Sequence, residues 1–378
     1  MNIKTNIFIL WACLVVAGLG QAVALAQEPP AEPNWSVIRR SPFAALDRGT
    51  AQRWLEATIR QLWAVQDVRA AQNQGKAFYE KLLEHYRAGD ATDAFREGMA
   101  EILTSVFTDL YTPDPANSQP PRPLSISYVL MVLRDFAQPA ALPAFQEALE
   151  DPTPGPRFVA AEGLAAIQGN LTDPQWTALI PSLQQAASRE SNGVALDRMY
   201  RVLLSGATGA RAEVIAEALT AILDARLEAF AEDTIAPQEA DGLAIEWLGE
   251  RVVRDNNDAL RLEMVGRAGG LLVHGVELFI RREPAPQHRQ QIEELIITAE
   301  RQLEALVRSV QPDAELPPIM VRAAMLEGGA QRDERMKSAL ARWVGTPDTP
   351  GTLNNEPFDL PVGLGIERDR SASPADAS

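Results

Sequence analysis

A cluster of prolines near the middle of the chain forces a break between two helices. The prolines are Pro152, Pro154 and Pro156. Each lacks a backbone N–H donor and has a fixed φ angle, so none of them can continue a helix that precedes it. We therefore expect one helix to end near Asp151 and the next to begin only around Pro156. This break, the proline corner, predicts a helical hairpin.

The residues after this corner have the pattern of a closely packed helix. Ala160, Leu164 and Ile167 share one helical face, and the alanines between them allow a neighbouring backbone to approach. The whole stretch resembles the turn and second helix of a HEAT repeat, D-P-x-P-x-x-R-x-x-A-A-E-x-L-x-x-I. The matching residues are Asp151, Pro152, Pro154, Arg157, Ala160, Ala161, Glu162, Leu164 and Ile167. The resemblance is best over Asp151 to Gln168, covers about residues 124–231, and implies an α-solenoid in which Asp151 and Arg157 tie adjacent repeats together.

Hydrophobic spacing predicts further helix pairs. The phrase Leu-Pro-Ala-Phe at residues 142–145 recurs thirty-eight positions later as Ile-Pro-Ser-Leu at 180–183. A third pair contains Leu196, Met199 and Leu203, followed by Ile215, Leu219 and Ile222. Repeat lengths in the upper thirties are typical of solenoids, in which each pair covers the apolar surface of the next. The predicted class is all-α: stacked helical hairpins preceded by an N-terminal helical hairpin.

The chain divides into six segments by composition and periodicity. They are a signal peptide (1–26), a polar, proline-containing lead-in (27–49), the N-terminal helical hairpin (50–111), a proline-rich linker (112–123), the HEAT-like repeat domain (124–344) and a flexible C-terminal tail (345–378). Within the hairpin, the first helix is expected to start near Thr50 and to bend near Gly75.

The N-terminal residues predict export. Lys4 precedes the apolar run Ile7 to Leu19, and Ala24-Leu25-Ala26 forms a small-x-small cleavage site. Cleavage after Ala26 would place the protein in the periplasm or outside the cell. It would also remove Cys13, the only cysteine, and with it disulfides, thiolate zinc sites and cysteine nucleophiles. An alternative is lipid attachment at Cys13, but Trp11 is too bulky for the usual lipid-attachment motif.

The charge balance limits the class of partner. Asp and Glu number 51 against 35 Lys and Arg, for a formal net charge of −16. Such a chain repels nucleic acid and anionic lipid, so neither is expected as a partner. A basic protein partner, or solubility alone, accounts for the excess. Beyond the signal peptide, no segment is long and uncharged enough to span a bilayer, so no integral membrane segment is expected after cleavage.

The three histidines show no catalytic spacing. His85 is expected to satisfy a local hydrogen bond, and His288 to be solvated. His274 and Glu277 are one helical turn apart, a spacing that metal sites use, but no second pair accompanies them. No metal site is therefore predicted.

Two other polar or glycine-rich stretches have structural explanations. Asp255 to Asp258 lacks the alternate spacing and terminal glutamate of a calcium loop, so it is expected to cap a helix. Four glycines interrupt an apolar helix with no preceding strand, which favours a close helix crossing over phosphate binding. They are Gly266, Gly269, Gly270 and Gly275.

Two features suggest contacts beyond the repeats. Leu295, Ala299, Leu303, Leu306 and Val310 form a heptad seam within Ile292 to Val310. The seam could support self-association, or pack within the chain. Apolar and other residues alternate strictly from Phe358 to Ile366, which indicates either a segment that docks in extended form or a disordered tail.

Two functions are compatible with these observations. The first is an exported HEAT-like scaffold or adaptor that binds a protein partner in the cell envelope, with no catalytic, cofactor-binding or metal residues predicted and no cofactor expected. The second is an envelope enzyme that acts on glycan or peptide through carboxylates in an all-α groove.

Overall fold

The computed structural model describes residues 30–111, 122–255, 257–281, 286–327 and 329–362. The predicted signal peptide and most of the proline-rich linker lie outside these residues. The described residues contain α-helices and short 3-10 helices, and their only β pairing is an isolated bridge between Thr346 and Thr349. The predicted all-α class is confirmed. The chain forms two compact units, residues 1–125 and 126–378.

Between residues 30 and 111, the first unit contains one short helix and three long ones. They are α2 (Trp35–Ile38), α3 (Ala45–Ala64), α4 (Val68–Tyr86) and α5 (Asp93–Tyr111). The expected start near Thr50 is wrong, because α3 already begins at Ala45. The expected bend at Gly75 is also wrong, since Gly75 lies inside α4. The break comes earlier, where the Asp67 side chain accepts a hydrogen bond from the Ala70 N–H (2.7 Å) and caps α4.

The lead-in of this unit is folded. Trp35, Ile38 and Phe43 are buried against the long helices. The prediction of an aperiodic polar lead-in up to residue 49 is therefore wrong for residues 35–49. These apolar residues are too irregularly spaced to show a helical or strand period, so the periodicity did not reveal their burial.

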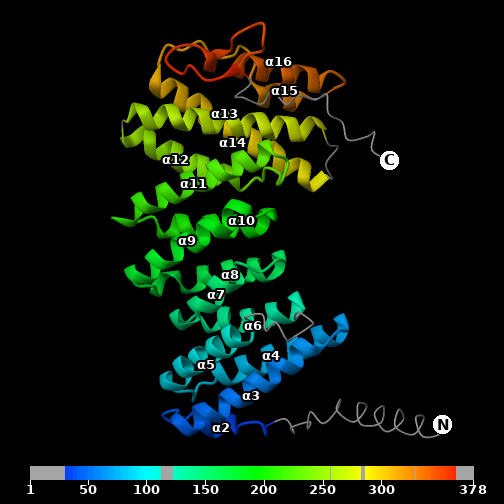
Figure 1. Ribbon diagram of the computed structural model, residues 1–378, viewed down its shortest axis with the longest axis vertical. Coiled ribbons are helices and arrows are strands. Elements are labelled where there is room, and N and C mark those ends of the chain that lie inside the picture. Colours follow the sequence, from blue (N-terminus) through cyan, green and yellow to red (C-terminus); the bar gives the residue numbers. More distant parts are fainter. Residues whose placement is uncertain (1–29, 112–121, 256, 282–285, 328, 363–378) are drawn as a thin grey trace, which may run out of the picture. The chain divides into compact units, whose positions relative to one another are not determined.

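The second unit is a succession of helices. They are α6 (Pro123–Phe136), α7 (Leu142–Ala148), α8 (Pro154–Ile167), α9 (Asp173–Arg189), α10 (Gly193–Gly206), α11 (Arg211–Ala231), α12 (Asp241–Asp255), α13 (Asp258–Arg281), α14 (Pro286–Val310), α15 (Val321–Glu327) and α16 (Arg332–Val344), with 3-10 helices η1 (Pro139–Ala141), η2 (Gln168–Asn170) and η3 (Thr352–Asn354). Each helix from α7 to α12 contacts the second helix after it in the chain. Two layers result, α7-α9-α11-α13 and α8-α10-α12-α14 (Figure 1).

This succession is that of a helical solenoid, as predicted. The recurring phrase at residues 142–145 and 180–183 lies in the neighbouring helices α7 and α9. The Gln146 amide of α7 donates to the Ala178 carbonyl and to Ser182 Oγ of α9, both at 3.1 Å. Equivalent helices thus stack directly on one another.

The proline corner differs from its prediction in two details. Helix α8 starts at Pro154 rather than Pro156, because a proline in the first helical turn loses no hydrogen bond. Arg157 donates to the Asp151 carbonyl (2.7 Å), but its ion pair is with Glu190 of the next corner, at 2.5 and 2.6 Å. The tie between repeats that the HEAT resemblance implied is therefore made by Arg157 with Glu190. Ala160 is fully buried, as expected.

The heptad seam packs inside the chain. Leu295, Ala299, Leu303 and Leu306 of α14 are fully buried, and α14 lies against α12 and α13. Glu300 on the same helix is also buried, and it accepts hydrogen bonds from the Val321 N–H (2.7 Å) and from Trp343 Nε1 (2.9 Å). Val310, the last residue of the seam, is half-buried. The seam thus joins the last helices by packing within the chain.

The first part of the predicted tail is folded as a set of turns. Leu353 is fully buried and Phe358 is nearly so. The Asn355 carbonyl accepts from both the Phe358 N–H (2.9 Å) and the Asp359 N–H (3.1 Å), a geometry that an extended strand cannot adopt. The prediction of an extended segment is wrong at residues 358–359, where the chain turns. Residues 363–366 lie outside the described part of the chain.

Candidate functional site

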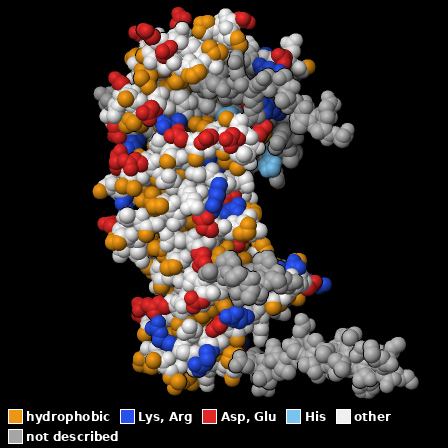
Figure 2. Space-filling view, in the orientation of Figure 1, with side chains coloured by type: hydrophobic (Ala, Val, Ile, Leu, Met, Phe, Trp, Pro, Cys, Tyr) orange, Lys and Arg blue, Asp and Glu red, His pale blue; other side chains and the backbone are white. Residues whose placement is uncertain are grey.

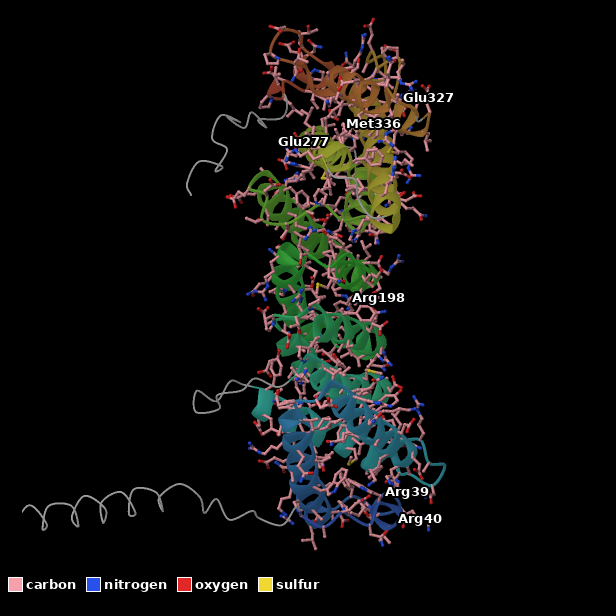
Figure 3. The ribbon with its side chains drawn as sticks, turned by 90° about the vertical axis from the view of Figure 1, so that its right-hand side faces the viewer. Arg39, Arg40, Arg198, Glu277, Glu327 and Met336 are labelled. Carbon is pink, nitrogen blue, oxygen red and sulfur yellow. The ribbon has the colours of Figure 1, made fainter. Side chains whose placement is uncertain are left out.

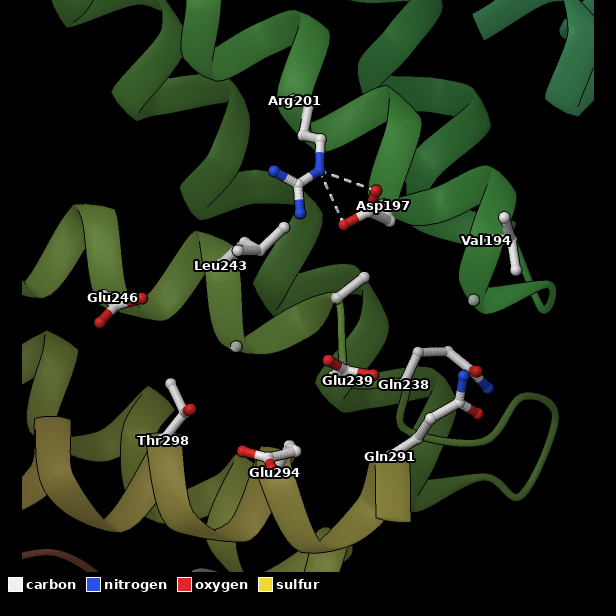
Figure 4. A pocket seen from close by; sticks show the side chains of 13 residues that line it. Val194, Asp197, Arg201, Gln238, Glu239, Leu243, Glu246, Gln291, Glu294 and Thr298 are labelled. Carbon is white, nitrogen blue, oxygen red and sulfur yellow. Dashed lines mark hydrogen bonds and ion pairs between the residues drawn. The ribbon is translucent and has the colours of Figure 1, made fainter. Parts of the chain in front are cut away.

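A cavity of about 270 Å³ opens on the layer formed by α10, α12 and α14 (Figure 4). Side chains from α10 and α14 face it from opposite sides, with α12 and the turn before it between them. The lining residues are Gly193, Val194, Asp197, Arg201, Gln238, Glu239, Ala240, Gly242, Leu243, Glu246, Gln291, Glu294 and Thr298. Three successive hairpins therefore contribute to a single site.

Local geometry brings these three elements close together. Asn192 caps α10 by accepting from the Val194 and Ala195 N–H groups, at 3.2 and 3.0 Å. At the next residue, Gly193, the missing side chain leaves room for Gln238, whose Oε1 would lie 2.7 Å from a Cβ atom there. A Cβ atom on Gly242 meets Thr298 Cγ2 at 3.3 Å. Glycine thus allows neighbouring repeats to meet at the cavity.

The cavity is acidic. Its carboxylates are Asp197, Glu239, Glu246 and Glu294, and its only basic lining residue is Arg201. Arg201 is already paired, since its Nε lies 3.0 and 2.8 Å from the two Asp197 carboxylate oxygens. The charge of one basic residue cannot offset four carboxylates, so the cavity carries a negative potential.

Two of these carboxylates keep an unneutralised charge. Glu246 pairs with Arg301 outside the cavity, at 2.6 Å. Within the described residues, neither Glu239 nor Glu294 has a basic nitrogen within 4.0 Å. Partial burial, Glu294 and Asp197 together raise the pKa of Glu239, and the nearby guanidinium of Arg201 opposes them. Burial is the largest of these effects, and the two neighbouring carboxylates add a negative field at Glu239.

A second, larger cavity of about 680 Å³ lies between the loop 311–318, α16 and the turns of residues 346–356. Its walls are mostly turns and prolines, and its charged residues include both Arg342 and acidic groups. The helix-walled cavity is the better candidate site because helices hold most of its charges in fixed positions.

The residues that the sequence singled out lie away from this cavity. His85 stacks on Trp35 in the first unit, with ring centroids 5.8 Å apart. His274 is buried edge-on against Phe230, at 5.7 Å, and Glu277 pairs with Arg281. No group of three or more His, Cys, Asp or Glu side chains in the described residues could hold a metal ion.

The remaining candidates have structural roles. The side chain of Asn257 accepts from the Leu260 N–H (3.3 Å) and caps α13, as expected for this polar stretch. Gly270 and Gly275 allow close helix crossings, because Cβ atoms there would lie 3.0 Å from Leu227 of α11 and 3.2 Å from Ile296 of α14. Neither feature contributes to a ligand site.

On the face shown in Figure 2, carboxylates are spread along the chain with Lys and Arg side chains among them. For this reason the sequence could not single out Asp197, Glu239 or Glu294. Asn192 followed by Gly193 is a sequence that predicts the N-cap of a helix. It does not predict that a cavity lies beside that helix.

Comparison of the chain with protein-family models, with curated proteins and with solved structures finds no match in any of the three. The solenoid architecture therefore rests on the helix contacts themselves. Among the described residues, none of the helices combines the length and the apolar character needed to cross a bilayer.

Proposed function

We propose that the protein is an exported scaffold that binds a protein partner, and that the cavity on α10, α12 and α14 receives a basic side chain of that partner. The observation that carries the proposal is a cavity with four carboxylates around one arginine that is already paired. Solenoid layers commonly present such composite surfaces to extended partners. A lysine or arginine is the side chain that would neutralise Glu239 and Glu294.

The cavity also favours an apolar neighbour beside the basic residue. Val194 at its edge is 54% exposed and offers an apolar surface beside the carboxylates. Contact with it would add apolar burial to the ion pair. Such apolar contact matters because an ion pair near the surface contributes only about 0–1 kcal/mol.

Neutralising the two unpaired carboxylates should weaken binding of a basic peptide. The probe is a fluorescent peptide of alternating Arg and Ala, measured by anisotropy at constant salt. We expect Glu239→Gln combined with Glu294→Gln to lower the affinity at least tenfold, about 1.4 kcal/mol. The matched control is Glu217→Gln combined with Glu232→Gln, which removes the same charge from exposed positions outside the cavity. Equal losses in the two double variants would show that the peptide senses only net charge, and would overturn the proposed site.

Binding should also weaken as the pH falls. Protonation of Glu239 removes the charge that attracts the peptide, and its pKa is raised above the ordinary 4.5. The loss should therefore begin at a higher pH than for an ordinary glutamate, and the Glu239→Gln variant should show a flatter profile. The same anisotropy titration, repeated at several pH values, measures this. If the affinities of the wild type and of Glu239→Gln depend on pH in the same way, Glu239 is not the group whose protonation weakens binding.

A further inference from the structure

A strap formed by residues 32–43 wraps the first unit and is anchored by aromatic packing. Trp35 is 3% exposed and meets Trp54 of α3 edge-on, with ring centroids 5.4 Å apart. Its other face stacks on His85 of α4 at 5.8 Å, and its edge meets Phe95 of α5 at 6.4 Å. One side chain of the strap thus holds it to all three long helices.

Polar contacts fasten the strap just beyond this anchor. Arg39 and Arg40 both pair with Asp90, at 2.7 and 2.5 Å, and lie close together at the end of α2 (Figure 3). The Thr92 N–H donates to the Arg39 carbonyl at 2.8 Å. Arg39 Nη1 also lies 3.4 Å from His85 Nδ1. His85 therefore contacts the strap twice, once through Trp35 and once through Arg39.

The second contact depends on the protonation state of His85. A neutral ring can accept from Arg39 through Nδ1, whereas a charged ring places an N–H and a positive charge against the guanidinium. Burial lowers the pKa of His85 from its usual 6.5, and Arg39 and Lys81 lower it further. Glu84 on α4 and Glu32 on the strap act in the opposite direction.

These interactions determine how strap closure depends on pH. Folding favours the neutral ring, so the contribution of His85 to strap closure is complete above about pH 6.5 and is lost as the pH falls below it. Asp90 does not interfere in that range, because its hydrogen bonds with Arg40 and Arg39 lower its pKa below 3.8. The aromatic anchor also carries a cost, since Trp35 Nε1 is buried with no hydrogen-bond partner among the described residues.

We propose that the strap is an acid-opened clasp: protonation of His85 detaches residues 32–43 from α4 and α5 and exposes the aromatic surface of Trp54 and Phe95. This device is separate from the cavity on α10, α12 and α14, and it does not depend on the proposed partner. It requires only that the ring of His85 and the guanidinium of Arg39 keep the contact described above.

A spin label on the strap tests the proposal. Val37 is 60% exposed, so Val37→Cys in a Cys13→Ser chain gives one labelling site with little disturbance. We expect the mobile fraction of the label to rise several-fold between about pH 8 and pH 4.5, with a midpoint below the usual histidine value. The helix content, measured by circular dichroism, should stay constant over this range.

Two histidine variants distinguish the clasp from general acid loosening. His85→Gln stays neutral and still offers an oxygen to Arg39, so the pH transition should disappear and the label should stay immobile. His288→Gln removes an exposed histidine elsewhere and should leave the transition unchanged. A label that stays immobile in the parent chain down to about pH 4.5, or a transition that persists in His85→Gln, would overturn the proposal.

Discussion

Replacing Arg226 by methionine should lower the free energy of unfolding by about 3–5 kcal/mol, the largest loss we expect from a single change in this chain. Arg226 has no exposed surface, and its guanidinium forms a two-point ion pair with Asp241, at 2.6 and 3.1 Å. The same group donates to the carbonyls of Ala187 (3.1 Å) and Glu190 (2.7 Å). Methionine fills similar space but leaves a buried carboxylate and two carbonyls without these donors.

The effect should be large because Arg226 joins three successive corners. Glu190, whose carbonyl it binds, pairs through its side chain with Arg157 of the preceding corner. Asp241 starts the next hairpin and also accepts from the hydroxyl of Tyr200, at 3.2 Å. Burial, followed by the Asp241 carboxylate, raises the pKa of Tyr200, so this hydroxyl stays a donor throughout the normal pH range.

Chemical denaturation with urea, followed by circular dichroism, measures the loss. The matched control is Arg189→Met, which removes an exposed arginine paired with Glu150 in the same unit and should cost no more than about 1 kcal/mol. A second variant, Arg226→Met with Asp241→Leu, should recover part of the stability because the Asp241 carboxylate is no longer buried without its partner. If Arg226→Met costs no more than Arg189→Met, the buried pair does not tie the corners together.

Replacing Gly163 by alanine should cost about 1–3 kcal/mol, although alanine is normally the better helix former. A Cβ atom at this position would lie 2.3 Å from both Cε1 and Cζ of the Phe145 ring. Phe145 is fully buried between α7 and α8, so the ring cannot turn away without disturbing its neighbours. The clash therefore separates the two helices of the hairpin that carries the proline corner.

Two further variants make this expectation specific to the clash. Gly155→Ala lies in the same helix and meets Ser127 Oγ at an ordinary 3.7 Å, so it should be neutral or slightly stabilising. Adding Phe145→Leu to Gly163→Ala should restore part of the stability, because the smaller side chain leaves room for the new methyl group. Thermal unfolding of the set measures this. If Gly155→Ala and Gly163→Ala destabilise the protein equally, the cause is the replacement of a helical glycine as such and not the contact with the Phe145 ring.

The helices and their buried faces could be predicted from local sequence. Leu196, Met199 and Leu203 share a face by spacing alone, and all three are fully buried in α10. Errors arose where local signals were weak or ambiguous. A proline can end one helix or start the next, so the position of Pro154 as the first residue of α8 was missed.

The candidate site could not be predicted in the same way. Asp197, Glu239 and Glu294 lie on three different hairpins, and each resembles many other carboxylates of an acidic chain. Only the stacking of α10, α12 and α14 brings them around one cavity. The clasp has the same origin, because Trp35 and His85 are far apart in sequence and meet only through folding.

The sequence by itself determined that this chain forms helices, where its sharpest corner lies, and that its helices must pair to cover their apolar faces. Those properties depend on residues within a few helical turns of one another. Tertiary structure decided which charges meet: Arg157 pairs with Glu190, and among the described residues no basic nitrogen forms an ion pair with Glu239. The physical reason is that electrostatic interactions depend on distance in space, which periodicity along a chain does not specify.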